Sequence, residues 1–363
     1  MTVKIRSWQM TGVRQPLSPT TRDLDESALQ PNTVVLRVAG CGVCHTDLGF
    51  LYDSVPTRHP LPLTLGHEIS GVVTHGGPGA EAWVGKSVVV PAVMPCGTCT
   101  ACKAGRGAIC PKQIFPGNDD HGGFASHVVV PSRGLCPVDV GAIEARGLGL
   151  VDLAVIADAV TTPYQAAINA GLGAGDVAVF VGIGGVGVFG VQIAKALGAA
   201  VAALDVDPVK VERAKSAGAS FARVIGKDDV KAIKAELKAW AKEQGLPATG
   251  HKIFETSGHP AGQALAFSLL NHGGHLAVVG FTPEPVTVRL SNLMAFDATA
   301  RGTWGCLPEH YPAVVELVAA GKISLLPFIE RRPMRDINAV FEALHKGELK
   351  KRPVLVPDFE ESA

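Results

Sequence analysis

The chain has 363 residues, a length that favours two domains over one, and 47% of them are apolar, which is enough for sizeable cores. Its 33 basic residues balance 33 acidic ones, so the composition argues against binding to nucleic acid or to an anionic membrane surface. The N-terminal residues lack the apolar segment of a signal peptide, so we expect a cytoplasmic protein whose eight cysteines stay reduced.

Residues 1 to about 150 are predicted to be rich in β-strands. Short apolar runs alternate there with glycine, proline and asparagine, at Val34–Val38, Ile69–Val73, Val88–Val93 and Phe124–Val130. This pattern favours a small distorted barrel over a parallel sheet.

Two short motifs in this region carry zinc-type ligands. The first contains Cys44 and the second contains His67, a soft and a borderline ligand that both suit zinc. A catalytic zinc takes three protein ligands and keeps one position open, so the third ligand must come from elsewhere in the chain. A cysteine and a histidine this far apart are weak evidence when taken alone.

A group of four cysteines is stronger evidence for a metal. Cys96, Cys99, Cys102 and Cys110 have the spacing C-x2-C-x2-C-x7-C, which allows four thiolates to close a tetrahedron around a structural zinc. An iron–sulfur cluster is the alternative, because similar spacing serves clusters and Pro111 follows the last cysteine. The second set of zinc-type ligands nearby favours zinc.

The stretch from 177 to 207 has the order expected of a dinucleotide-binding unit. Val177 to Val181 is a wholly apolar run typical of a buried parallel strand. Gly182, Gly184 and Gly187 then form G-x-G-x-x-G, which gives a tight turn, room for a pyrophosphate and close helix packing. Asp205 follows a second apolar run, where a carboxylate would bind a ribose 2′-OH and repel a 2′-phosphate, so NAD is favoured over NADP.

The rest of the second half reads as helices and further strands. The uncharged stretch 177–194 is long enough for a membrane span, but its glycines and its place in a βαβ pattern argue against one. We expect a covering helix from Asp228 to Gly245, an edge strand at Val286–Leu290 and helices over 308–320 and 336–346.

Together these motifs resemble the medium-chain, zinc-dependent alcohol dehydrogenases. The resemblance rests on Cys44-His45-Thr46-Asp47, Gly66-His67-Glu68, the four cysteines, the glycine motif and Asp205. It implies an α/β plus β fold, in which a chaperonin-10-like (GroES-like) β-barrel catalytic domain carries an inserted Rossmann domain with a doubly wound parallel sheet. We expect the catalytic domain at 1–154 and 299–363, with a structural zinc lobe at about 94–112, and the NAD-binding domain at 155–298.

The resemblance also implies a third zinc ligand. The family usually places a cysteine just before the nucleotide domain, and Asp158 stands at that position here. An aspartate binds zinc and carries the same charge as a thiolate. The alternatives are that Asp158 is an ordinary acid at a helix N-terminus, or that Glu68 enters the zinc shell.

Further roles are implied residue by residue. Thr46 resembles the hydroxyl that takes the substrate proton, and Asp47 resembles the carboxylate that orients the ligand histidine. A family relay often ends on a histidine where this chain has Gly49, and His59 is a possible substitute. The implied cofactor contacts are made by His45, Gly182, Gly184, Gly185, Val186, Gly187, Asp205, Lys210 and Arg352.

Within this family, the chain most resembles the 6-hydroxycyclohex-1-ene-1-carbonyl-CoA dehydrogenases of anaerobic benzoyl-CoA degradation, in the sequence around Cys44 and in Asp158. This implies oxidation of an alicyclic acyl-CoA by NAD, with two zinc ions per chain and a homodimer or homotetramer. One alternative is a general NAD-dependent alcohol or polyol dehydrogenase that acts on free alcohols, and another is a non-catalytic cofactor-binding relative.

Overall fold

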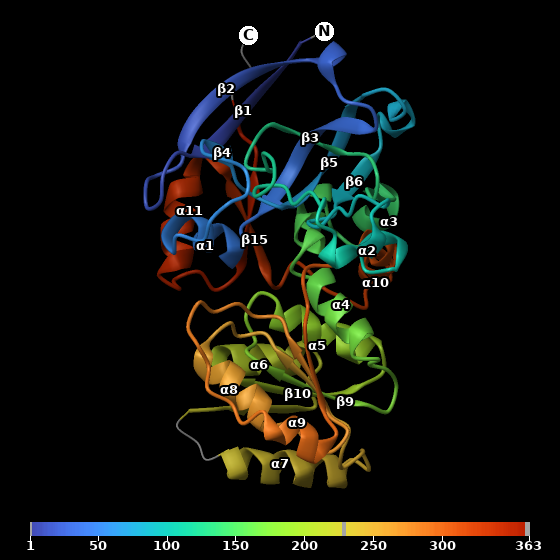
Figure 1. Ribbon diagram of the computed structural model, residues 1–363, viewed down its shortest axis with the longest axis vertical. Helices are drawn as coiled ribbons and strands as arrows, with labels where there is room; N and C mark the ends of the chain where they lie inside the picture. Colours follow the sequence, from blue (N-terminus) through green and yellow to red (C-terminus); the bar gives the residue numbers. More distant parts are fainter. Residues whose placement is uncertain (1, 227–229, 360–363) are drawn as a thin grey trace. The chain divides into compact units, whose positions relative to one another are not determined.

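The structure is a computed structural model that describes residues 2–226 and 230–359 (Figure 1). It divides into two compact units. The first combines the chain up to Thr161 with the chain from Gly305 onward, and the second is Thr162–Trp304. The domain boundaries expected from the sequence were 154/155 and 298/299.

The first unit is built from two sheets, in which nearly all the strands pair antiparallel. A three-stranded sheet has the order β2-β1-β4, and a seven-stranded sheet has the order β15-β16-β3-β5-β6-β8, with β7 also paired to β3. The strands are β1 Thr2–Met10, β2 Ser18–Asp25, β3 Thr33–Gly42, β4 Leu63–Thr64, β5 Glu68–Gly76, β6 Ser87–Val90, β7 His127–Pro131, β8 Cys136–Pro137, β15 Ile329–Pro333 and β16 Arg352–Val356.

Strand β3 is the centre of this unit. It pairs with β5, β7 and β16, and its register with β5 shifts between Val35 and Leu36 and again between Val38 and Gly40. Such bulges bend a strand and let a sheet curl around its own core. The buried side chains of β3, β5 and β6 lie in one cluster with those of the returning segment, including Phe341 and Leu355.

Short helices connect these strands. The α-helices are α1 His45–Tyr52, α2 Thr100–Lys103, α3 Val140–Glu144, α10 Tyr311–Ala319 and α11 Ile337–His345. The 3-10 helices are η1 Glu26–Ala28, η2 Glu81–Trp83, η3 Gly107–Ile109, η4 Leu150–Ala157, η5 Pro308–His310 and η6 Met334–Asp336. The two helices predicted for the returning segment are confirmed as α10 and α11.

The second unit is a six-stranded parallel sheet with the order β11-β10-β9-β12-β13-β14. The strand order reverses between β9 and β12, which is the doubly wound arrangement expected from the sequence. The strands are β9 Val177–Val181, β10 Ala200–Asp205, β11 Phe221–Val224, β12 Lys252–Glu255, β13 His275–Val278 and β14 Thr299–Gly302. The helices are α4 Thr161–Asn169, which begins at the boundary, α5 Gly187–Ala196, α6 Pro208–Ala217, α7 Val230–Glu243, α8 Pro260–Ser268 and α9 Ser291–Phe296.

Helix α7 confirms most of the predicted covering helix, with Ile233, Leu237 and Trp240 buried on one face. Asp228, where that helix was expected to begin, lies outside the described residues. No helix in the described ranges is both long and apolar enough to cross a membrane. The uncharged stretch 177–194 forms β9, the glycine turn and most of α5.

The edge strand predicted at Val286–Leu290 is wrong. These residues are irregular, and β13 is instead covered by β14, with His275 opposite Thr299. The strand at this end of the sheet is β14, which is exposed along its length.

Candidate metal and dinucleotide sites

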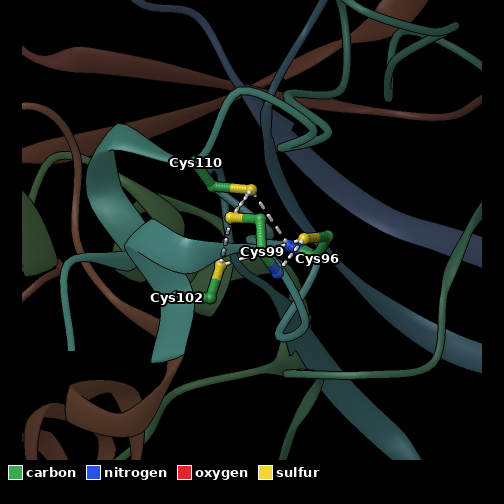
Figure 2. Close-up of side chains that lie close together, drawn as sticks. All are labelled: Cys96, Cys99, Cys102 and Cys110. Atoms are coloured by element: carbon green, nitrogen blue, oxygen red, sulfur yellow. Dashed lines mark hydrogen bonds between the residues drawn. The ribbon is translucent and has the colours of Figure 1, made fainter. Parts of the chain in front are cut away.

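The four-cysteine lobe forms a compact sulfur cluster in the first unit (Figure 2). Cys96, Cys99, Cys102 and Cys110 lie close enough to hold one metal ion. The Sγ atom of Cys99 lies 3.5 Å from that of Cys102 and 3.7 Å from that of Cys110. The Sγ atoms of Cys96 and Cys102 are 3.9 Å apart. A tetrahedral zinc with four thiolates would separate sulfurs by about 3.8 Å. An iron–sulfur cluster would hold them farther apart, because several atoms lie between them, so the geometry favours zinc.

Hydrogen bonds and desolvation within the lobe shift the pKa values of two of these thiols in opposite directions. Hydrogen bonds from Thr98, first through its hydroxyl, and from the Cys99 amide lower the pKa of the Cys96 thiol to about 5. The opposite holds at Cys102, where desolvation and the thiol of Cys99 raise the pKa to about 12. One sulfur of the group is therefore ionised at neutral pH before any metal binds.

The second ligand set lies at the ends of three segments of the same unit. Cys44 precedes α1, His67 precedes β5 and Asp158 follows η4, and their ligand atoms lie within 4.8 Å of one another and of Glu68. Asp158 Oδ2 is 3.5 Å from Cys44 Sγ and 3.5 Å from His67 Nε2. A tetrahedral zinc shell of sulfur, nitrogen and oxygen separates ligand atoms by about 3.3–3.6 Å, so the three residues fit one zinc ion.

His67 gives an independent sign of a metal. Its ring is buried, and neither ring nitrogen has a hydrogen-bond partner. Burial lowers the pKa of His67, but Asp47 and Asp158 more than offset this and raise it well above its usual value. This anionic surrounding favours a cation at the imidazole, and a zinc ion bound at Nε2 would satisfy it.

Asp47 lies beside the histidine and is hydrogen-bonded to the backbone next to both ligands. Its Oδ1 atom lies 3.5 Å from His67 Nδ1 and accepts a hydrogen bond from the Gly66 amide, and its Oδ2 atom accepts one from the Cys44 amide at 2.9 Å. The carboxylate is completely buried. The resemblance implied that Asp47 orients the ligand histidine; the Asp47–His67 pair is longer than a good hydrogen bond, and this role stays a prediction.

Glu68 and Arg352 form a buried ion pair beside the same ligands. Arg352 donates from Nη2 to Glu68 Oε1 at 2.5 Å and from Nε to Oε2 at 2.8 Å, and Ala159 N–H donates to Oε1. Glu68 is thus held by its neighbours while its carboxylate remains near the zinc ligands. The structure gives Arg352 a partner in Glu68, and its role at the pyrophosphate stays a prediction.

The other implied residues of this unit lie on or near α1. Thr46 Oγ1 is 3.8 Å from Cys44 Sγ, and His45 is exposed at the start of the helix. Gly49 lies inside α1 and is buried. His59 lies in the following loop, where its Nδ1 is 2.6 Å from the Pro60 carbonyl oxygen.

The glycine motif of the second unit has the geometry of a phosphate-binding turn. Gly182 has a φ of 93°, and a Cβ there would lie 2.5 Å from Ser257. A Cβ on Gly187 would lie 2.0 Å from the Gly182 carbonyl oxygen, whereas a Cβ on Gly184 would meet only open space. These are the three glycine roles that a dinucleotide requires, so the turn fits the pyrophosphate.

Asp205 ends β10 beside this turn. Its Oδ2 accepts a hydrogen bond from Ile183 N–H at 2.5 Å, and its Oδ1 accepts one from Asp207 N–H at 2.9 Å. Gly185 and Val186 complete the turn before α5, and Lys210 is half-buried in the first turn of α6. All the residues predicted for NAD in this unit therefore lie at the carboxyl ends of β9 and β10 or in the helices that follow.

Two side chains that support the zinc ligands were missed by sequence reasoning. The hydroxyl of Tyr311 donates to the Ala157 carbonyl and accepts from Ala92 N–H, which fixes the residue preceding Asp158. The ring of Phe115 packs against His67 at a centroid distance of 4.7 Å. Each contact joins residues far apart in the chain, so no local pattern signals it.

Comparisons with known proteins agree with this geometry. Residues 30–140 match the alcohol dehydrogenase GroES-like domain, and residues 185–320 match the zinc-binding dehydrogenase domain. An alcohol dehydrogenase of Geobacillus stearothermophilus is 30% identical over 92% of this chain and 94% of its own length. A 2-dehydro-3-deoxy-L-galactonate 5-dehydrogenase of Pseudoalteromonas atlantica is 30% identical over 86% of this chain and 88% of its own.

Solved structures give the same result. The crystal structure of the alcohol dehydrogenase from Aeropyrum pernix superposes with a TM-score of 0.81 at 28% identity, covering 97% of this chain and 100% of the other. An alcohol dehydrogenase from Thermotoga maritima superposes with a TM-score of 0.85 at 24% identity, covering 98% and 100%, which supports the fold. The chain belongs to the medium-chain, zinc-dependent alcohol dehydrogenase family.

Proposed function

We propose that this protein is an NAD-dependent dehydrogenase that oxidises free secondary alcohols or polyols. The observation that carries the proposal is the convergence of Cys44, His67 and Asp158 at distances suited to one zinc ion. Three protein ligands leave a fourth position for the oxygen of a substrate.

Bound zinc would lower the pKa of a coordinated alcohol oxygen, and bound NAD would accept the hydride. The residues around these groups supply orientation and proton transfer. Asp47 holds His67 toward the ligand position, and Thr46, next to Cys44, takes the alcohol proton. Because Gly49 has no side chain to pass the proton on, we expect onward transfer to solvent.

The choice of NAD follows from Asp205. Its carboxylate lies at the glycine turn, where it would accept from the ribose hydroxyls of NAD and repel the 2′-phosphate of NADP. Lys210 and Arg352 are proposed to contact the ribose and the pyrophosphate, respectively.

We propose free alcohols as the substrates because the two relatives described above are named for an alcohol and for a sugar acid, respectively. The narrower alternative is 6-hydroxycyclohex-1-ene-1-carbonyl-CoA, which the sequence around Cys44 implied.

The deciding experiment is a substrate panel with NAD, in which the cyclic hydroxyacyl-CoA is compared with its free acid, simple secondary alcohols and polyols. Turnover of free alcohols supports the proposal, and turnover of the thioester alone overturns it. A chain with no zinc beside Cys44 and no turnover would instead be a non-catalytic relative.

We also propose a homodimer or homotetramer. Phe281, Leu290 and Met294 expose 70%, 68% and 79% of their surface in one segment of the second unit, and β14 is exposed along its length. Exposed apolar residues and an exposed edge strand are each typical of an interface. Light scattering should give a multiple of the 37.7 kDa chain mass, and Leu290→Lys with Met294→Lys should reduce it.

A further inference from the structure

Glu255 is a buried carboxylate that the proposed reaction does not use. It is the last residue of β12 and is completely buried. Its Oε1 accepts hydrogen bonds from Ser257 Oγ at 2.5 Å, Ser257 N–H at 2.8 Å and Gly258 N–H at 3.2 Å. All three donors converge on this one oxygen of the carboxylate.

The second oxygen of this carboxylate lacks a partner. Oε2 is buried without a hydrogen bond, and no lysine, arginine or histidine within residues 2–226 and 230–359 forms an ion pair with Glu255. A Cβ on Gly280 would lie 2.7 Å from Oε2, so this oxygen faces the glycine that follows β13. An unpaired buried anion is costly, and a nearby cation would compensate for it.

The position of Glu255 indicates which cation. The strand order reverses between β9 and β12, and a dinucleotide binds at the carboxyl ends of the strands at such a point. The glycine turn and Asp205 belong to the half with β9 and β10, which would take the adenosine side. The nicotinamide side therefore falls to the half that begins with β12, at whose carboxyl end Glu255 lies.

The residues after Glu255 connect it to the glycine turn. Thr256 Oγ1 donates to the Gly182 carbonyl oxygen at 2.6 Å, and Ser257 lies against Gly182 so closely that a Cβ there would be 2.5 Å away. Glu255 thus fixes a loop that supports the dinucleotide turn and also places a negative charge in the same region.

We propose that Glu255 contributes more to the binding of NAD⁺ than to that of NADH, and so shifts the ratio of the two affinities toward the oxidised cofactor. This rests on the proposed dinucleotide function. The nicotinamide ring carries a positive charge in NAD⁺ and none in NADH, whereas the adenosine and pyrophosphate portions are the same. A fixed, unpaired carboxylate on the nicotinamide half attracts only the oxidised ring.

The test is a comparison of three ligands on the zinc-loaded, full-length protein. Glu255→Gln removes the charge at nearly the same size and keeps an oxygen that accepts hydrogen bonds. Ser257→Ala is the matched control, because it removes the short hydroxyl bond and leaves the charge. Dissociation constants for NAD⁺, NADH and ADP-ribose, which lacks nicotinamide, are measured by calorimetry.

With Glu255→Gln we expect NAD⁺ to bind about tenfold more weakly while NADH and ADP-ribose stay within about twofold. Ser257→Ala should change all three by the same factor. An equal loss for all three ligands in Glu255→Gln, or no loss, overturns the proposal and leaves Glu255 a purely structural residue.

If Glu255→Gln does not fold, Glu255→Asp serves as a second variant, because it moves the charge back by one methylene. It should also lower the ratio of NAD⁺ affinity to NADH affinity. An unchanged ratio overturns the proposal. Failure of the wild-type protein to bind any of the three ligands would instead refute the dinucleotide function itself.

Discussion

Asp158 adds an oxygen ligand to a site that otherwise offers sulfur and nitrogen. Replacing it with alanine should lower the zinc content from two ions per chain, one for each ligand group, to one, and abolish turnover. Metal analysis by mass spectrometry measures the content. Asp158→Cys is the control, since a thiolate has the same charge and is expected to keep both ions. Two bound ions in the alanine variant would remove Asp158 from the zinc shell.

Asp205 joins the glycine turn to the proposed ribose site. In Asp205→Ser we expect the ratio of kcat/KM for NAD over NADP to fall by at least about tenfold, because the repulsion of a 2′-phosphate is lost. Asp207→Ala is the control: Asp207 caps α6 through Val209 N–H and lies two residues away. An unchanged ratio in Asp205→Ser would exclude Asp205 as the selective residue.

The Glu68–Arg352 pair should contribute strongly to stability when only one partner is lost. Arg352→Met leaves a buried carboxylate without its cation and should destabilise the protein by about 3–5 kcal/mol in urea unfolding. Lys346→Met breaks the exposed pair with Glu342 and should change the unfolding free energy far less, because solvent screens that pair. Similar losses in the two variants would contradict the buried-pair assignment.

Among the structural elements, the cysteine lobe offers a test that depends on pH. After zinc is removed, alkylation at pH 6 should modify Cys96 first, because its pKa of about 5 lies below that pH, and Cys102 last, because its pKa of about 12 lies far above it. Below pH 5, Cys96 becomes protonated and its advantage should disappear. Peptide mass spectrometry identifies the modified residues, and the zinc-loaded protein is the protected control.

Elements with a local signal were predictable from the sequence. The run Val177–Val181 is β9 to the residue, because every side chain in it is buried and glycines follow at once. Val286–Leu290 was predicted as an edge strand but is irregular, and the pairing with β13 is made by β14 instead, which no local pattern signals. The sites differ in the same way. Short local motifs identified Cys44 and His67 as candidates, but the unpartnered oxygen of Glu255 depends on residues that only the fold brings together, so the sequence did not predict it.

For the whole molecule, zinc and the dinucleotide should act on different parts of the chain. Both metal groups belong to the first unit, and the glycine turn with Asp205 belongs to the second. Hydrogen exchange should therefore slow around 182–187 and 205–210 when ADP-ribose is added, and quicken around 44–67 and 96–110 when zinc is chelated. Protection by ADP-ribose confined to the first unit would contradict this division.

The chain order of the two units has a consequence for biosynthesis. Strand β3 pairs with β16, and in this pairing Val354 of β16 lies opposite Gly42 of β3, so β3 must wait while the ribosome makes all the residues between them, which include the second unit. At about 5–20 residues per second, this wait lasts roughly 15–60 s. During that time the nascent barrel has an unpaired strand edge, whereas the second unit has all its described strands as soon as Trp304 is made. We therefore expect the growing chain to engage a chaperone through its first 160 or so residues, and to release it only after synthesis of the last strand.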